Sequence, residues 1–247
     1  MNSATHDPFD DSRLDAVCGS DAAAGDMAEG SAEVPTLSLK DVALSASVLG
    51  ALFYFDPDDE RCAAALAFAL SPDAAAQWPG ADGSGDAVDQ AFALMRRNAE
   101  TQEAERGETL HQTFARLMVG PGHLVAPPWG SVYTDPESVI FGNLTLDVRA
   151  WLRENGVKMH LDLREPEDHF GLMLTMFSWA VRNGASDEAL RELLEQHLLP
   201  WTPRYLELFG AGSEGTFYEG LGALAAATLA AWVDALDLEP ATRRLYR

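Results

Sequence analysis

Apolar residues recur at helical spacing along most of the chain and predict a series of amphipathic helices. The first begins after Ser38, a residue type that caps helices, and ends at Asp56-Pro57; one face carries Leu39, Val42, Ala46, Leu49, Leu52 and Phe53. Similar patterns predict helices over about 59–70, 86–99, 102–119, 145–155, 166–182, 187–198 and 216–236, with a short one near 204–209. Period-2 alternation, which is typical of strands, is nearly absent. The pattern therefore predicts an all-α fold.

Residues between these segments indicate where helices end and where a long loop lies. Gly120-Pro121-Gly122 ends the helix before it, Thr145 and Ser186 are candidate N-caps, and Gly156 is a candidate C-terminal glycine. The segment from 120 to about 143 has no helical pattern. A loop this long in a compact domain is usually functional.

Composition divides the chain into two parts. Residues 1–36 hold eight acidic residues, one arginine and few large apolar groups, which is typical of a disordered tail. The remainder, 37–247, is expected to form one all-helical domain, because 47% of the residues are hydrophobic. The apolar stretches 42–55 and 220–233 have 14 residues each, too few to cross a bilayer, and the N-terminus has no signal-peptide pattern. We therefore expect a cytoplasmic protein without membrane insertion.

The charge restricts the class of partner. The formal net charge is −22, so the protein should repel nucleic acid and anionic lipid and attract cationic partners. The acidity could also serve only to keep the protein soluble. Two cysteines without a CxxC pair give no sign of a disulfide framework or a thiolate metal site.

The run Glu165-Pro166-Glu167-Asp168-His169 has two interpretations. It could simply start a helix, with Glu165 as cap, Pro166 in the first turn and the next two acids near the positive end of the helix dipole. It could instead be a charged site for a cationic group or for acid/base chemistry. Together with His160 and Asp162 it would allow a metal-dependent hydrolase, although no HExxH spacing supports one.

An apolar stripe formed by Leu110, Phe114, Leu117 and Met118 also has two interpretations. Such stripes usually face a core. This one precedes the long loop that carries Trp129, so it could also line an adaptable apolar groove for a peptide. No GxSxG elbow, phosphate loop or dinucleotide fingerprint is present, and we therefore expect a binding protein and not an enzyme.

Several motifs in order resemble one family over about residues 40–245. They are Pro127-Pro128-Trp129-Gly130-Ser131-Val132-Tyr133, Glu137-Ser138-Val139-Ile140-Phe141-Gly142, Glu165-Pro166-Glu167-Asp168-His169-Phe170-Gly171 and His197-Leu198-Leu199-Pro200-Trp201. This series resembles the TorD/DmsD family, the cytoplasmic chaperones of molybdenum-containing redox enzymes. It is most similar to the DmsD branch, which serves dimethyl sulfoxide reductase.

The resemblance implies a single all-helical domain that binds the twin-arginine leader of a molybdopterin oxidoreductase and delays Tat export until its cofactor is inserted. Dimethyl sulfoxide reductase is the implied client, and trimethylamine N-oxide, nitrate and selenate reductases are alternatives. The Tat translocase and molybdenum-cofactor biosynthesis proteins are further expected partners, and the chaperone needs no cofactor of its own. Both a monomer and a domain-swapped dimer are compatible with the sequence.

The leader-binding residues implied by the resemblance are Phe114, Leu117, Met118, Pro128, Trp129, Gly142, Asp168 and His169, to which the charged run adds Glu165. A twin-arginine leader has two guanidinium groups beside a moderately apolar stretch. Carboxylates can hold one guanidinium through charge-assisted hydrogen bonds while an apolar groove buries the rest. The net charge of −22 would speed the encounter with such a peptide.

Overall fold

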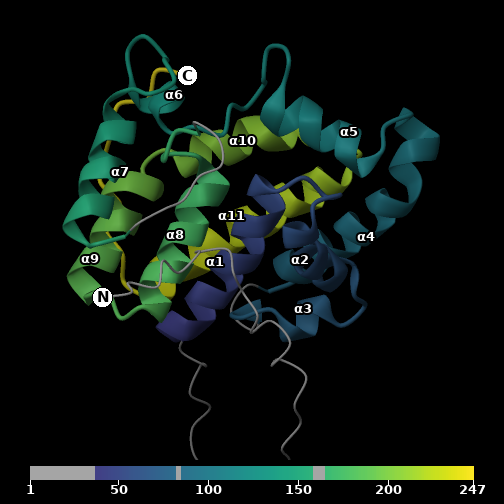
Figure 1. The fold of residues 1–247 in the computed structure, drawn as a ribbon. Coiled ribbons are helices and arrows are strands. Elements are labelled where there is room, and N and C mark those ends of the chain that lie inside the picture. The colour runs from purple at the N-terminus through teal and green to yellow at the C-terminus, as the bar shows by residue number, and fades with distance from the viewer. Residues whose placement is uncertain (1–36, 82–84, 158–164) are drawn as a thin grey trace, which may run out of the picture.

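The computed structural model describes residues 37–81, 85–157 and 165–247. The predicted acidic tail, 1–36, lies outside the described residues, so its disorder and the boundary at residue 37 stay predictions. His160 and Asp162, which the hydrolase interpretation needs, also lie outside them. The described part of the chain forms helices joined by turns and loops (Figure 1).

The helices, in chain order, are α1 (Leu39–Tyr54), α2 (Glu60–Leu70), α3 (Ala74–Gln77), α4 (Ala87–Arg106), α5 (Leu110–Phe114), α6 (Ser131–Thr134), α7 (Asn143–Glu154), α8 (Phe170–Arg182), α9 (Asp187–Glu192), α10 (Thr202–Ser213) and α11 (Phe217–Ala235). Two π-helical turns, η3 (Ala115–Val119) and η4 (Leu193–Leu198), extend α5 and α9. Within the described ranges there is no β-strand, and the all-α prediction is confirmed. None of the helices found there is long and apolar enough to span a membrane.

Several predicted helix ends are confirmed by their capping contacts. Ser38 and Asp41 form a reciprocal capping box at the start of α1. The Ser186 side chain accepts a hydrogen bond from the Ala189 amide at the start of α9. Gly156, just beyond α7, has φ of +68°, a conformation that glycine adopts without steric cost. These ends depend on local contacts, which the sequence encodes directly.

Other predicted boundaries were wrong. The expected break near residues 100–101 does not exist, because α4 continues to Arg106 and ends at Gly107, whose φ is +72°. Helix α7 begins after Gly142, so Thr145 is a buried residue of its first turn and not its cap. Helix α8 begins at Phe170 with His169 as N-cap. The short helices α3 and α6 were not predicted, and α10 is longer than expected.

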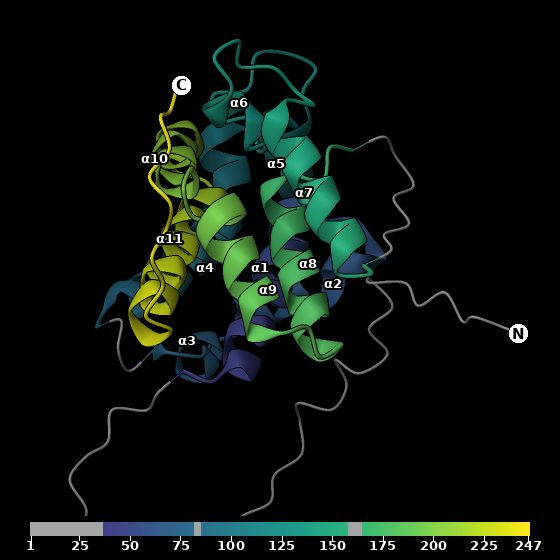
Figure 2. The same cartoon turned by 90° about the vertical axis from the view of Figure 1, so that its left-hand side faces the viewer.

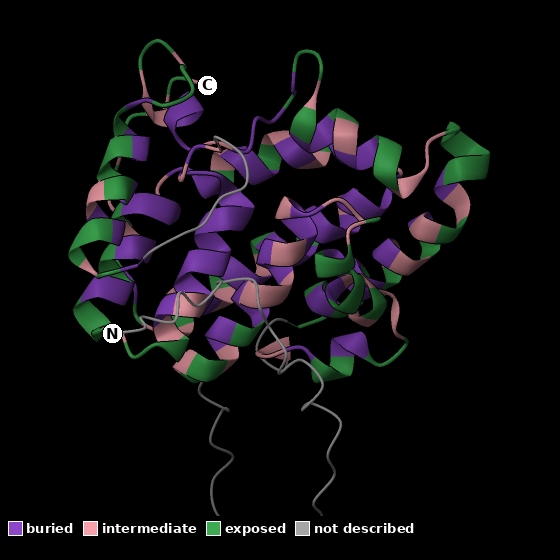
Figure 3. Cartoon of the chain, in the orientation of Figure 1, coloured by how far each residue is buried: buried purple, intermediate pink, exposed green. Residues whose placement is uncertain are grey.

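The centre of the molecule is built from α1, α4, α8 and α11. Helix α1 packs along α8, and α4 packs along α11, with α1 also contacting α11 (Figure 2). Two crossings are close enough to require glycine. A Cβ atom on Gly171 would lie 2.9 Å from the Gly50 carbonyl oxygen, and one on Gly220 would lie 2.7 Å from the Ala91 carbonyl oxygen. Buried residues accordingly line the inward faces of these helices (Figure 3).

Aromatic side chains fill the core below the long loop. The Phe53 ring of α1 lies 4.8 Å from the Phe170 ring at the start of α8, between centroids. The Tyr133 ring of α6 stacks on the Trp201 ring at 5.4 Å. Such pairs contribute about 0.5–1.5 kcal/mol each beyond the area they bury. This cluster therefore fixes α6 and the first turn of α8 relative to α1.

Candidate functional site

The long loop and the start of α8 meet through paired backbone groups. The Phe170 amide donates to the Pro128 carbonyl oxygen at 2.7 Å, and the Gly130 amide donates to the Asp168 carbonyl oxygen at 3.0 Å. Trp129 and His169 form an isolated antiparallel bridge between these two bonds. The structure thus joins the proline-rich loop and the charged run, which lie nearly forty residues apart in the sequence.

Asp168 ties three helices together. Its carboxylate accepts a hydrogen bond from the Ser131 amide at 2.6 Å and another from the Thr145 hydroxyl at 2.8 Å, and its side chain is fully buried. The Ser131 and Thr145 hydroxyls also pair with each other at 3.0 Å. Asp168 thus binds the first amide of α6 and the first turn of α7. The interpretation that it sits at the positive end of its own helix was wrong, since α8 begins two residues later.

His169 is the N-cap of α8 and is 5% exposed. Its Nδ1 atom accepts a hydrogen bond from the Gly171 amide at 3.2 Å. The ring meets the Tyr54 ring edge-on at 5.1 Å and the Trp129 ring at 6.2 Å. Burial lowers the pKa of His169 to about 3, because charging the ring there would cost its hydration. The imidazole is therefore neutral at physiological pH and supplies an acceptor and an aromatic surface.

Within the charged run, solvent reaches the carboxylates of Glu165 and Glu167, both half-buried. The Trp129 indole N–H donates to Glu165 Oε1 at 2.5 Å. Burial raises the pKa of Glu165, the Trp129 hydrogen bond opposes this, and the Asp168 charge adds to it. Glu165 does not cap α8 as one interpretation required, since His169 does. Glu167 accepts from Arg149 Nε at 2.7 Å through both oxygens.

The apolar stripe lies in the core. Phe114, Leu117 and Met118 are each 3–5% exposed, and Phe114 packs against Tyr218 of α11. The core interpretation of the stripe is therefore confirmed for these three side chains, while their part in leader binding stays a prediction. Pro128 and Gly142 are buried as well. A Cβ on Gly142 would lie 3.1 Å from Asp135 and Ser131 atoms, so this glycine permits close packing of the loop on α6.

The structure also has a second apolar surface, which was not predicted from the sequence. Val139, Ile140, Phe141 and Leu146, which we call the apolar loop patch, are 39–56% exposed at the end of the molecule that carries α6 and α7 (Figure 1). Two non-glycine residues of this loop, Ser138 and Phe141, have positive φ values of 49° and 64°. Such backbone conformations cost about 1–3 kcal/mol and cluster at ligand sites. The Val-Ile-Phe run inside an irregular segment was the available signal, but exposure cannot be read from sequence.

The patch and the carboxylates adjoin. Arg149 pairs with Glu167, and its guanidinium carbon lies 5.6 Å from the centroid of the Phe141 ring. Leu146 stands one turn before Arg149 on α7. A peptide with a cationic group and apolar neighbours could therefore contact Glu165 or Glu167 and the patch at once. This surface is held in place by buried residues of the loop and the charged run, namely Pro128, Asp168 and His169.

One cluster among the described residues has metal-ligand geometry, and it lies elsewhere. Asp56 and Asp58, between α1 and α2, approach His111 of α5, with His111 Nδ1 2.7 Å from Asp56 Oδ2. These groups are mostly exposed, as surface ion pairs commonly are. None of them belongs to the charged run on which the hydrolase interpretation was based.

Comparison with known proteins gives consistent matches. Residues 82–207 match the family described as nitrate reductase delta subunit. The chain is 41% identical to the Tat proofreading chaperone DmsD of Salmonella typhi, an alignment that spans 85% of this chain and 98% of that protein. It is 32% identical to the probable Tat proofreading chaperone DmsD of Haemophilus influenzae over the same shares. A more distant relative is the chaperone protein TorD of Psychrobacter, 27% identical over 41% of this chain and 49% of that protein.

Proposed function

Because the chain belongs to the TorD/DmsD family, we propose that it is a chaperone which binds the twin-arginine leader of a molybdopterin oxidoreductase precursor in the cytoplasm. The observation that carries the proposal is the 41% identity to a Tat proofreading chaperone over nearly its full length. The relatives' names describe chaperones and no enzymatic activity, in agreement with the absence of catalytic motifs from the sequence.

The geometry of the site supports this proposal in a particular form. A leader guanidinium would meet Glu165, whose second carboxylate oxygen accepts no hydrogen bond from the described residues. Trp129 offers its ring beside that carboxylate, and cations interact favourably with indole faces. The apolar loop patch would cover the apolar side chains next to the leader's arginines. Asp168 and His169 then act as the buried frame that holds Trp129 and the loop, so their part in leader binding is indirect.

Dimethyl sulfoxide reductase, through its catalytic subunit, is the client we propose, since the relatives from Salmonella typhi and Haemophilus influenzae carry the DmsD name. A trimethylamine N-oxide reductase is the alternative that the TorD similarity favours. In either case the Tat translocase and molybdenum-cofactor biosynthesis proteins are the partners that a leader-holding chaperone would meet next.

The test is calorimetry of the full chain with a synthetic twin-arginine leader, for which we expect a Kd of about 1 μM, or roughly −8 kcal/mol. Glu165→Gln should weaken binding about tenfold, because it removes a charge-assisted hydrogen bond at a half-buried position. Glu154→Gln removes the same charge from an exposed position of α7 and is the matched control. No heat with leaders from any molybdoenzyme of the host would overturn the proposed function. Equal losses in both variants would remove Glu165 from the site.

A further inference from the structure

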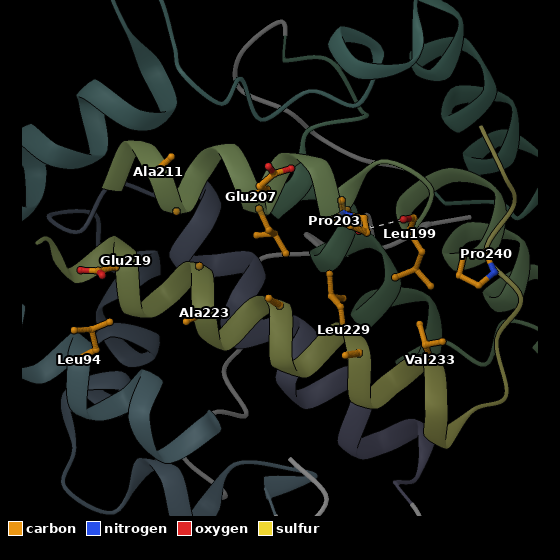
Figure 4. A pocket seen from close by; sticks show the side chains of 16 residues that line it. Leu94, Leu199, Pro203, Glu207, Ala211, Glu219, Ala223, Leu229, Val233 and Pro240 are labelled. Atoms are coloured by element: carbon orange, nitrogen blue, oxygen red, sulfur yellow. Dashed lines mark hydrogen bonds between the residues drawn. The ribbon is translucent and has the colours of Figure 1, made fainter. Parts of the chain in front are cut away.

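A long apolar groove lies between α10 and α11 (Figure 4), and none of the residues that line it belongs to the apolar loop patch or the charged run. Its volume is about 750 Å³. Pro203 and Leu206 of α10 form one wall, and α11 supplies the floor from Glu219 to Val233. Leu94 of α4 lies at one end of the groove and Pro240 at the other (Figure 4).

The composition of α11 is typical of a helix that is buried on all sides, which indicates that a partner covers this groove. Among its 19 residues only Glu219 and Asp234 are charged, so the helix is apolar on every side. Helices of that kind are normally buried all round. Here, however, Ala223, Ala226 and Ala230 are exposed at positions i, i+3 and i+7, which lie on one face. Small side chains on that face would let the backbone of another helix come close.

The charged residues that line the groove restrict the chemistry of the ligand that could bind in it. Among the described residues that line the groove, the charged ones are Glu207 and Glu219. Each has one carboxylate oxygen that accepts no hydrogen bond from the described part of the chain. A second copy of this chain, with net charge −22, would bring like charges together. The acidic segment 1–36 would do the same, so the fitting occupant is an apolar helix flanked by basic residues.

The length and position of the groove restrict the choice of ligand further. From Glu219 to Val233 the floor spans fourteen residue steps, or about 21 Å of helix. That length suits the apolar stretch of an export leader, which runs to about 7–15 residues behind a basic segment. One end of the groove, at Ala211, adjoins Gly212, where a Cβ would lie 3.3 Å from the Val125 Cβ. Val125 belongs to the loop that continues to Trp129, so the groove begins beside that loop.

We propose that this groove binds the apolar stretch of the client's leader as a helix, with basic residues that flank this stretch directed toward the carboxylates of Glu219 and Glu207 while the twin arginines lie at Glu165. The proposal rests on the proposed function, because it names where the second half of the same ligand lies. The groove gives the leader a second apolar surface, beside the apolar loop patch, in a structure that keeps Phe114, Leu117 and Met118 in the core.

The test measures fluorescence anisotropy of a labelled synthetic leader that has two arginines and an Ala/Leu stretch of about twelve residues. Ala226→Glu places a charge under the apolar stretch and should weaken binding at least about tenfold, although the added negative charge alone would favour a cationic peptide. Ala64→Glu adds the same charge at an exposed position of α2 and should leave the affinity unchanged. Ala230→Gln is a second groove variant, and thermal melting checks that each variant is folded.

A second peptide separates the groove from the rest of the site. It keeps the two arginines but replaces the apolar stretch with Gly/Ser, and it should bind more weakly to the unmodified chain and equally to the Ala226→Glu variant. If the first leader binds the unmodified chain while Ala226→Glu and Ala230→Gln bind it just as well, the groove proposal is overturned and the proposed function survives. If neither peptide binds the unmodified chain, it is the proposed function that fails.

Discussion

The buried contact between Asp168 and Thr145 gives the sharpest prediction about how the site is held. Asp168→Ala would leave the Ser131 amide without its acceptor, since Ser131 is fully buried. An unsatisfied buried donor costs about 1–3 kcal/mol, and losing a hydrogen bond to a carboxylate costs about 1.5–3 kcal/mol. The Thr145 hydroxyl can turn to Ser131 Oγ, 3.0 Å away, and recover part of its loss. We therefore expect Asp168→Ala to lower the free energy of unfolding by about 3 kcal/mol or more.

A double-mutant cycle with Thr145→Val isolates the pair. Urea denaturation followed by circular dichroism gives the free energy of unfolding for each variant, and the midpoint should fall without a change in the m-value. The coupling energy should be about 1–3 kcal/mol, because the two side chains share one hydrogen bond. Additivity within about 0.5 kcal/mol would refute this reasoning. Full stability of Asp168→Ala together with lost leader binding would show that Asp168 faces the peptide.

Three further predictions concern neighbouring residues. Leu117→Ala should lower the free energy of unfolding by about 2–5 kcal/mol, because Leu117 is a core residue. The leader affinity of the folded protein should stay the same. An unchanged melting midpoint with weakened leader binding would contradict this. Burial lowers the pKa of His169 from 6.5 to about 3, so the unfolded chain binds the proton more readily than the folded one. The free energy of unfolding should therefore fall as pH drops below 6.5, by up to about 1.4 kcal/mol per pH unit. His169→Asn, which keeps a capping side chain, should flatten that dependence in pH-resolved denaturation, and an unaltered slope would argue against it. Burial raises the pKa of Glu165, so this carboxylate becomes protonated at a higher pH than an ordinary glutamate. Leader affinity should therefore decline on acidification from that higher pH. Glu165→Gln should remove the decline in a calorimetric pH series.

The sequence by itself determined the helical class and the ends that depend on neighbouring residues. Ser38 and Ser186 cap as predicted, and Gly156 ends α7, because capping is a contact between residues three or four apart. The ordered motifs also led to the correct family. The break assigned near residue 100 failed because Thr101 has the chemistry of a cap but no glycine or proline stands beside it to end the preceding helix, and α4 continues to Gly107.

Only the tertiary structure decided which residues of the site reach solvent. The stripe of Phe114, Leu117 and Met118 has the same helical spacing whether it faces a groove or a core, and its packing against α10 and α11 puts it in the core. Thr145 has the chemistry of a cap, but Asp168, far along the chain, takes its hydroxyl. Exposure and long-range partners depend on which surfaces the other helices cover. The sequence pattern records which side chains are apolar or polar, and it does not record which surfaces are covered.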